Sequence, residues 1–584
     1  MPDSEPPPQA THIDYNDHRY PGTLAIRLGI CVPLTSVVFV FKPSALSSPA
    51  GCLPTEILLK IFAFCVAPDQ SNNEAFTALH IVRISHVCHA WREISLAYPS
   101  FWSNIAFKTP YLATTMIERS KPLPIAVRAN LTPGGGILDD DSYPIRSMFK
   151  AASRALRNSD RAKEINLRTA PSARLTKAFQ DIQPTSSQLE YLALRGYGDS
   201  SRSNVFDVPS SVFSHCVFPL KTVILERCKV VPSVITRHCA QLTHLELRSV
   251  PSFNVGDLVS IFRLAASSLQ SIILDTLPIP GGVFKKIPHT SFPELSLLNF
   301  SAPNGDSHAH NVFFLLHFMT IPVTATLNLQ FLILGPTWQM PAPIIPTLGR
   351  HFSGGDPILS LIIFQSSHQK RRGLRIQGWT IPTLPRFFYP EESPPPIIDV
   401  HWVCDEADDG GSLERILTDL VSVGPLHAVQ ALTIARVTVL SATAMDSLLL
   451  MLPSLREVCI HGSASLRAIC GLEPSGGPIS RSPPLVRLRE LQSLTIYEAS
   501  FRNDGTQDVD LHALRTCLDD LSTRGCGITE LIVCYSDAWR QDMEELAKLV
   551  KQFLWDGSIN GTMSVPAPFQ TDRHSPAVGV VRSE

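Results

Sequence analysis

The sequence predicts an α/β protein in which a small three-helix module precedes a solenoid of short parallel strands and helices. Three observations favour this fold. Two short helical patterns follow one another between about residues 53 and 98. Beyond about residue 160, a strand pattern with apolar residues at positions 1, 4 and 6 recurs along the chain. Segments with helical spacing lie between these strands, as a stack of strand-and-helix units requires.

Composition limits the classes of function. The chain of 584 residues is 44% hydrophobic and 17% charged, so most of it should fold. Its 50 Lys and Arg residues are balanced by 52 Asp and Glu residues. Because this balance gives no positive electrostatic field that would attract phosphate groups, we expect no nucleic-acid partner. The 13 cysteines are scattered, several in apolar runs. Buried thiols of this kind are typical of a reducing compartment, which predicts a cytoplasmic or nuclear protein.

Residues 1–50 are predicted to form a leader that is largely disordered and contains one apolar segment. The proline-rich start cannot build a core. The apolar segment, residues 23–41, has about the length of a membrane span, but Arg27 and Pro33 interrupt it. Its uncharged part, residues 28–41, is shorter than the roughly 20 residues that a spanning helix needs. We therefore favour a strand or an unstructured leader over a membrane anchor.

A helical module is predicted over residues 51–106. Pro54 suits the first position of a helix, and Glu56 suits its first turn. Apolar residues then form a stripe, which comprises Ile57, Leu58, Ile61 and Phe62. A second helical pattern runs at steps of three and four through Ile81, Ile84, Val87, Cys88, Trp91 and Ile94. About 50 residues make too small a core to hide every large apolar side chain, so a partner should cover part of this surface.

This module resembles an F-box of the variant common in fungal proteins. The resemblance is carried by Leu53–Phe62 with its Leu-Pro start, by Val87-Cys88-His89-Ala90-Trp91 and by Pro99-Ser100-Phe101-Trp102. It departs from the family in a longer segment between the helices, about residues 65–74. In that family the apolar face docks on a Skp-family adaptor, which leads to a cullin scaffold. Carried over, the resemblance implies these adaptor-binding residues: Leu53, Pro54, Ile57, Leu58, Ile61, Val87, Cys88 and Trp91.

Residues 107–160 are predicted to be a linker region, and residues 161–556 a repeat array. Clear strand copies are Leu189/Leu192/Leu194, Leu220/Val223/Leu225, Leu242/Leu245/Leu247, Leu269/Ile272/Leu274 and Leu295/Leu298/Phe300. Weaker copies are expected at Leu329/Leu332/Leu334, Leu359/Ile362/Phe364 and Ile397/Val400/Trp402. Clear ones return at Val429/Leu432/Ile434, Leu455/Val458/Ile460, Leu491/Leu494/Ile496 and Ile528/Leu531/Val533. The array resembles the leucine-rich repeats that often follow an F-box, although its period is irregular.

Two parts of the array depart from the simple pattern. Prolines crowd residues 336–396, where we expect irregular loops. A last helix is expected over residues 539–554, as a terminal cap, and residues 557–584 should be a disordered tail. Outward strand residues should be exposed to a target: Glu190, Tyr191, Thr222, Glu226, Thr243, His244 and Glu246.

The sequence predicts no catalytic, cofactor-binding or metal site, and we expect no enzyme. It contains no Cys-x-x-Cys pair, no Gly-x-Ser-x-Gly elbow and no phosphate or dinucleotide loop. The resemblance instead implies a substrate-receptor subunit of a Skp/cullin/F-box-type ubiquitin ligase, whose repeats bind an unidentified protein target. Two alternatives stay open. In the first, Leu58, Ile61, Val87 and Trp91 only pack internally, the helices form a structural cap, and the chain is a non-ligase repeat scaffold. In the second, residues 23–41 enter a membrane and the chain is a tethered receptor.

Overall fold

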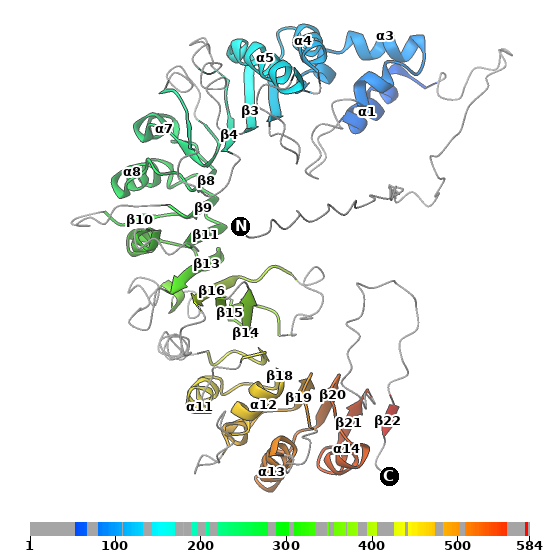
Figure 1. Cartoon of the computed structure of the whole chain (residues 1–584), viewed down its shortest axis with the longest axis vertical. Coiled ribbons are helices and arrows are strands. Elements are labelled where there is room, and N and C mark those ends of the chain that lie inside the picture. The colour runs from blue at the N-terminus through cyan, green and yellow to red at the C-terminus, as the bar shows by residue number, and fades with distance from the viewer. Residues whose placement is uncertain are drawn as a thin grey trace, which may run out of the picture. The chain divides into compact units, whose positions relative to one another are not determined.

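A computed structural model of the chain is shown in Figure 1. The structure describes residues 53–66, 80–107, 109–131, 143–169, 179, 188–196, 205–210, 220–277, 288–302, 309–333, 347–349, 356–368, 371–382, 394–405, 426–437, 442–472, 483–501, 509–556 and 579–581. The leader and its apolar segment at residues 23–41 lie outside these ranges. Within them, no helix combines the length and the apolar character that crossing a membrane requires.

The N-terminal part of the described chain is mainly helical. Its helices are α1 (Thr55–Val66), α3 (His89–Ala97), the 3-10 helix η2 (Pro99–Trp102), α4 (Pro110–Arg119), α5 (Tyr143–Arg157) and the 3-10 helix η3 (Ser159–Arg161). Residues 80–84 are also helical, and a turn at residues 85–87 separates them from α3. The single helix predicted through residues 81–94 is therefore wrong. Cys88 has extended backbone angles and its sulfur accepts a hydrogen bond from the Trp91 N–H, which starts a new helix.

One large, mainly parallel sheet runs through the remaining described chain, which confirms the α/β class. Its strands are β1 (Asn104–Ala106), β2 (Ile125–Leu131), β3 (Ala162–Thr169), β4 (Tyr191–Gly196), β6 (Thr222–Glu226), β8 (His244–Arg248), β9 (Ser271–Asp275), β11 (Leu297–Ala302), β13 (Thr326–Ile333), β14 (Ser360–His368), β15 (Arg371–Trp379), β16 (Ile398–Asp405), β17 (Ala431–Ala435), β18 (Glu457–His461), β19 (Ser493–Tyr497), β20 (Glu530–Cys534), β21 (Gln552–Trp555) and β22 (Gly579–Val581).

Helices and short strand pairs lie in the described parts of the connections. The later helices are α7 (Pro232–His238), α8 (Val255–Ala265), α11 (Ala442–Leu450), α12 (Ser463–Ile469), α13 (Val509–Thr523) and α14 (Arg540–Ala547), with the 3-10 helices η5 (Ala309–Phe318) and η7 (Pro484–Arg487). Two small parallel pairs join β5 (Phe206–Asp207) to β7 (Cys228–Lys229), and β10 (Thr290–Ser291) to β12 (Met319–Thr320).

Parallel pairing aligns the apolar strand positions. One row of paired residues runs from β4 to β11 through Leu192, Val223, Leu245, Ile272 and Leu298. None of these side chains is exposed. Side chains alternate between the two faces of a strand, so the residues between them form a second, half-buried face. The first five clear strand copies therefore have the predicted phase, and the first residue of each copy, including Leu295, is buried as well.

A left-handed turn recurs where several strands end. The residue after the strand has φ between 49° and 55° at Arg227, Ser249, Thr276, Arg436, Glu498 and Tyr535. The N–H groups of Arg227, Ser249 and Thr276 each donate, at 2.8 Å, to a carbonyl in the last two residues of the next strand. A left-handed residue costs about 1–2 kcal/mol. These cross-strand hydrogen bonds offset that cost and continue the backbone ladder past the strand.

In its described parts, residues 107, 109–131 and 143–160, the predicted linker at residues 107–160 is structured. It contains α4, β2 and α5, and β2 pairs in parallel with both β1 and β3. In β2 the buried residues alternate as Ile125, Val127, Ala129 and Leu131. This period of two suits a strand with one covered face. The sheet thus begins before the repeat pattern that we recognised in the sequence.

The predicted loops at residues 336–396 are also partly wrong. Strands β14 and β15 pair antiparallel, and β15 pairs antiparallel with β16, while β13 pairs in parallel with β16. The predicted phase is wrong in two weak copies. Leu329, predicted as the first residue of its copy, pairs with Phe300, the last residue of its own copy. In β14, Leu361 and not the predicted Ile362 pairs with Leu432. Continuous apolar runs such as Leu361-Ile362-Ile363 show no alternation, so the sequence alone cannot set their phase.

The C-terminal end of the sheet differs from the predicted cap. Helix α14 ends at Ala547, and Phe553 lies in β21, where it pairs with Leu531 of β20. Met543 and Leu546 of α14 are buried, as the helical pattern predicted. Within the predicted disordered tail, β22 pairs antiparallel with β21. The other tail residues lie outside the described ranges.

Candidate functional site

Helix α1 presents an apolar stripe to solvent. The exposed fractions are 37% for Leu53, 41% for Ile57, 39% for Ile61 and 85% for Phe64. Ile57, Ile61 and Phe64 are spaced by four and three residues, so they share one face of the helix. Pro54 at the start of the helix is also exposed. Large apolar side chains gathered on one face are typical of a protein-interaction surface.

The adjacent side of α1 supplies core residues. Leu58 is only 4% exposed and Phe62 is fully buried. Leu58 was expected to contact an adaptor, and its burial favours the structural alternative for this residue. Phe64 was missed in the sequence, although it continues the spacing of three and four residues that Ile57 and Ile61 begin. The helical spacing of the stripe was the signal that could have identified it.

The second set of predicted contact residues divides in the same way. Val87 is 60% exposed and Cys88 is exposed, next to the turn before α3. Trp91 is half-buried, and its ring centroid lies 4.9 Å from that of Phe62. Val87 and Cys88 are therefore accessible to a partner, whereas Trp91 contributes to the packing of α3.

A buried aromatic cluster holds the helices of this module in place. The Phe62 ring lies 6.2 Å from the Phe101 ring in an edge-on arrangement. The Trp102 indole N–H donates a 2.8 Å hydrogen bond to the Ser95 carbonyl of α3. The Arg119 guanidinium of α4 lies 4.4 Å above the centre of the Trp102 ring. Trp102 thus connects η2 to both α3 and α4.

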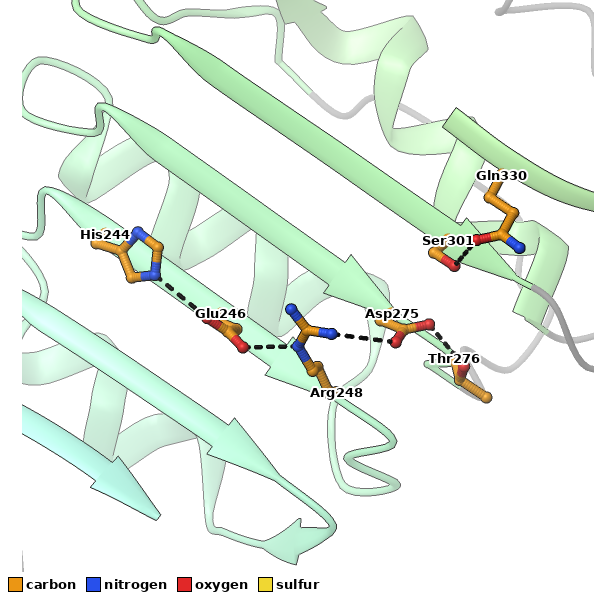
Figure 2. Close-up of polar contacts among 7 residues, drawn as sticks. All are labelled: His244, Glu246, Arg248, Asp275, Thr276, Ser301 and Gln330. Atoms are coloured by element: carbon orange, nitrogen blue, oxygen red, sulfur yellow. Dashed lines mark hydrogen bonds and ion pairs between the residues drawn. The ribbon is translucent and has the colours of Figure 1, made fainter. Parts of the chain in front are cut away.

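A second candidate surface follows the half-buried face of the sheet, across β8 to β13. Figure 2 shows its hydrogen bonds and ion pairs. Glu246 accepts from Arg248 at 2.6 Å and lies 3.5 Å from His244. Arg248 also lies 3.8 Å from Asp275, whose other oxygen accepts from the Thr276 hydroxyl at 2.8 Å. One strand further, the Ser301 hydroxyl donates to the Gln330 side chain at 3.2 Å.

The charges on this face are stabilised by their neighbours. Burial raises the pKa of Glu246, but hydrogen bonds from His244 and Arg248 outweigh it and hold this pKa below its ordinary value. Burial likewise opposes the charge of Arg248, yet Glu246 and Asp275 raise its pKa. Both groups therefore stay charged near neutral pH, and their paired charges make a fixed polar surface.

The outward residues expected from the sequence all lie on or beside this half-buried face. They are Glu190, Tyr191, Thr222, Glu226, Thr243, His244 and Glu246, and each is partly exposed. The structure adds Arg248 and Asp275, which no pattern in the sequence indicated. They lie 27 residues apart and meet because β8 pairs with β9. Only strand pairing could have identified this ion pair.

A Cys–His contact occurs on the same face of the sheet, in β18. The Cys459 sulfur lies 3.4 Å from His461 Nε2. Burial raises the pKa of Cys459 to about 12 and lowers that of His461 to about 4. Both groups are thus neutral near pH 7, which is the reverse of an activated thiolate. Within the described residues there is no group of three or more His, Cys, Asp or Glu that could hold a metal ion.

Comparison with known proteins bears on the helical module. No curated protein matches the chain. A family model described as F-box-like matches residues 50–108, which include the exposed stripe of α1 and the aromatic cluster. Domains of this type are typically protein-interaction modules without enzymatic activity. The chain therefore contains an F-box-like domain at residues 50–108.

Proposed function

We propose that this chain is the substrate-receptor subunit of a Skp/cullin/F-box-type ubiquitin ligase. Its F-box-like domain binds a Skp-family adaptor and, through that adaptor, a cullin scaffold. The rest of the chain, proposed to be a leucine-rich-repeat-like solenoid, holds a protein target. The receptor itself performs no chemistry and acts in the cytoplasm or nucleus.

The match to the F-box-like family, together with the exposed stripe of α1, carries the proposal. The stripe exposes four large apolar side chains, those of Leu53, Ile57, Ile61 and Phe64. Burial of such side chains against a partner stabilises a complex by roughly 25 cal/mol for each Å² of apolar surface removed from water. We assign adaptor contact to this stripe and to Val87 and Cys88. Leu58 and Trp91 support the contact surface from within the domain.

The polar face of the sheet supports the second half of the proposal. Residues such as His244, Glu246 and Arg248 are partly exposed, and strands positioned by a buried apolar layer hold them in place. A target bound on this face would be attached to the same chain as the adaptor-binding domain. Recognition and recruitment then need no further subunit between them.

Co-expression of the full chain with a Skp-family adaptor tests the proposal. We expect the two to co-purify, and Ile61→Asp to weaken the affinity at least tenfold, because a carboxylate would be buried against an apolar partner. Lys60→Asp is the matched control, since it puts the same carboxylate on an exposed neighbouring position of α1. Both sites are exposed, so both variants should fold.

Two outcomes would reject the ligase role or its proposed surface. A folded wild type that does not bind the adaptor would leave the chain as a repeat scaffold whose F-box-like helices form a structural cap. Equal adaptor affinity for Ile61→Asp and Lys60→Asp would mean that the adaptor docks elsewhere. Circular dichroism of each variant separates lost binding from lost folding.

A further inference from the structure

We propose that four neutral side chains on β11 and β13 bind the main chain of an extended polypeptide segment. This neutral strip consists of Asn299 and Ser301 of β11 with Asn328 and Gln330 of β13. The inference rests on the proposed function, because it specifies which chemistry on the sheet would hold a protein target. It locates the contact at two strands of the sheet.

Strand pairing brings the four side chains together. Asn299 pairs with Asn328, and Ser301 pairs with Gln330, in the parallel ladder between β11 and β13. Within each strand the two residues are separated by two positions, so all four lie on the same face. The buried face of the same strands carries Leu298, Phe300, Leu327 and Leu329, none of which is exposed. The neutral strip is thus held by a packed layer beneath it.

The neutral strip lies between two groups of paired charges. On one side, Arg248 of β8 lies 2.6 Å from Glu246 and 3.8 Å from Asp275. Figure 2 marks both contacts. On the other side, Arg375 of β15 binds both carboxylate oxygens of Asp399, at 2.7 and 2.5 Å. Each arginine already has its counter-charge. These flanks therefore favour a neutral hydrogen-bonding ligand over a phosphorylated or strongly acidic one.

The amides of the neutral strip have unused hydrogen-bonding capacity. An asparagine side chain offers two donors and an acceptor oxygen with two lone pairs. In the part of the chain that the structure describes, the half-buried Asn299 and Asn328 side chains make no hydrogen bond. Ser301 and Gln330 bond to one another, which leaves the Gln330 NH₂ group as an additional donor. Half-buried amides of this kind gain from a ligand that offers both donors and acceptors.

The main chain of an extended peptide has this chemistry and a fitting repeat. Each residue other than proline offers one N–H and one C=O. Groups on the same side of an extended chain recur every two residues, or about 6.7 Å. Asn299 and Ser301 have that same separation along β11, and neighbouring strands lie about 4.8 Å apart. The neutral strip therefore presents polar groups at the repeat of an extended backbone.

The test uses the full chain and a displayed library of random short peptides as the probe. We expect the folded wild type to capture peptides. The double variant Asn299→Leu/Asn328→Leu should bind a captured peptide with an affinity at least about 10-fold lower, because each lost amide should lower the affinity roughly three- to tenfold. Thr495→Val is the control, since Thr495 lies half-buried on β19 in the row of paired residues that also contains Asn328. N-methylation of alternate peptide nitrogens should cause a similar loss, because it removes main-chain donors and keeps the side chains.

Three results would overturn the inference. In the first, the folded wild type captures no peptide. In the second, wild type and the double variant bind a captured peptide with equal affinity. In the third, wild type binds the N-methylated peptide as tightly as the unmethylated one. Titration of the same preparations with a Skp-family adaptor keeps the two proposals distinct. Captured peptides without adaptor binding reject the ligase role and leave the neutral strip supported. Adaptor binding without an effect of the asparagine variants rejects the neutral strip alone.

Discussion

Replacement of Trp102 should loosen the F-box-like domain and its connection to α4. The side chain is 1% exposed, donates a hydrogen bond to the Ser95 carbonyl and lies beneath the Arg119 guanidinium. Trp102→Ala removes all three interactions and leaves a cavity. Truncations of this kind cost about 3–5 kcal/mol. Trp102→Phe keeps most of the packing but leaves the Ser95 carbonyl without its donor, which costs about 1–3 kcal/mol.

Hydrogen exchange measured by mass spectrometry can follow this change locally. We expect amides of α3 and α4 to exchange roughly 10²- to 10³-fold faster in Trp102→Ala, since each 1.4 kcal/mol corresponds to a factor of ten. Tyr111→Ala is the control, because Tyr111 lies on α4 with 82% of its surface exposed and should have little effect. Unchanged protection of α3 and α4 in Trp102→Ala would refute the role assigned to this indole.

Further predictions concern the sheet. Burial lowers the pKa of His461 from 6.5 to about 4, so the unfolded chain binds a proton at a higher pH than the folded chain does. The contribution of neutral His461 to the free energy of unfolding should therefore be complete above pH 6.5 and should fall by about 3 kcal/mol as the pH drops to 4. Urea titrations over this pH range should find a smaller slope in His461→Gln. Gly196→Ala would place a methyl group 2.9 Å from the Arg227 carbonyl oxygen and should cost about 1–3 kcal/mol, whereas Gly527→Ala, whose nearest contact is 3.9 Å away, should melt like wild type. Asp399→Ala should cost about 1–3 kcal/mol by leaving the partly exposed Arg375 unpaired, and a double-mutant cycle with Arg375→Ala that shows no coupling would contradict this ion pair.

The helical module shows what local sequence can determine. The acidic first turn and Pro54 indicated the start of α1 to within one residue, since Pro54 precedes the helix that begins at Thr55. The motif residues identified the F-box-like family. Exposure within the module could not be read in the same way. Leu58 and Ile61 are both apolar and three residues apart, yet one is buried and the other is exposed. Which apolar residue faces the core depends on where the neighbouring segments pack.

The sheet shows the same division. Strand phase was readable where apolar residues alternate, as at Leu245 and Leu247, because a period of two is a local property. It was not readable in β14, where consecutive apolar residues are buried on both faces. The antiparallel course of β14 to β16 depends on which strands pair, and that choice is made between segments far apart in the chain.

The amino-acid sequence by itself thus determined the helical character of the N-terminal module, the spacing of most strands and the likeness of residues 50–108 to the F-box family. The tertiary structure decided which side chains meet. Arg248 and Asp275, or Asn299 and Asn328, are separated by more than twenty residues and become neighbours only through pairing of adjacent strands. Local patterns record the burial preference of each residue, whereas such contacts depend on how the connecting segments return the chain to the sheet.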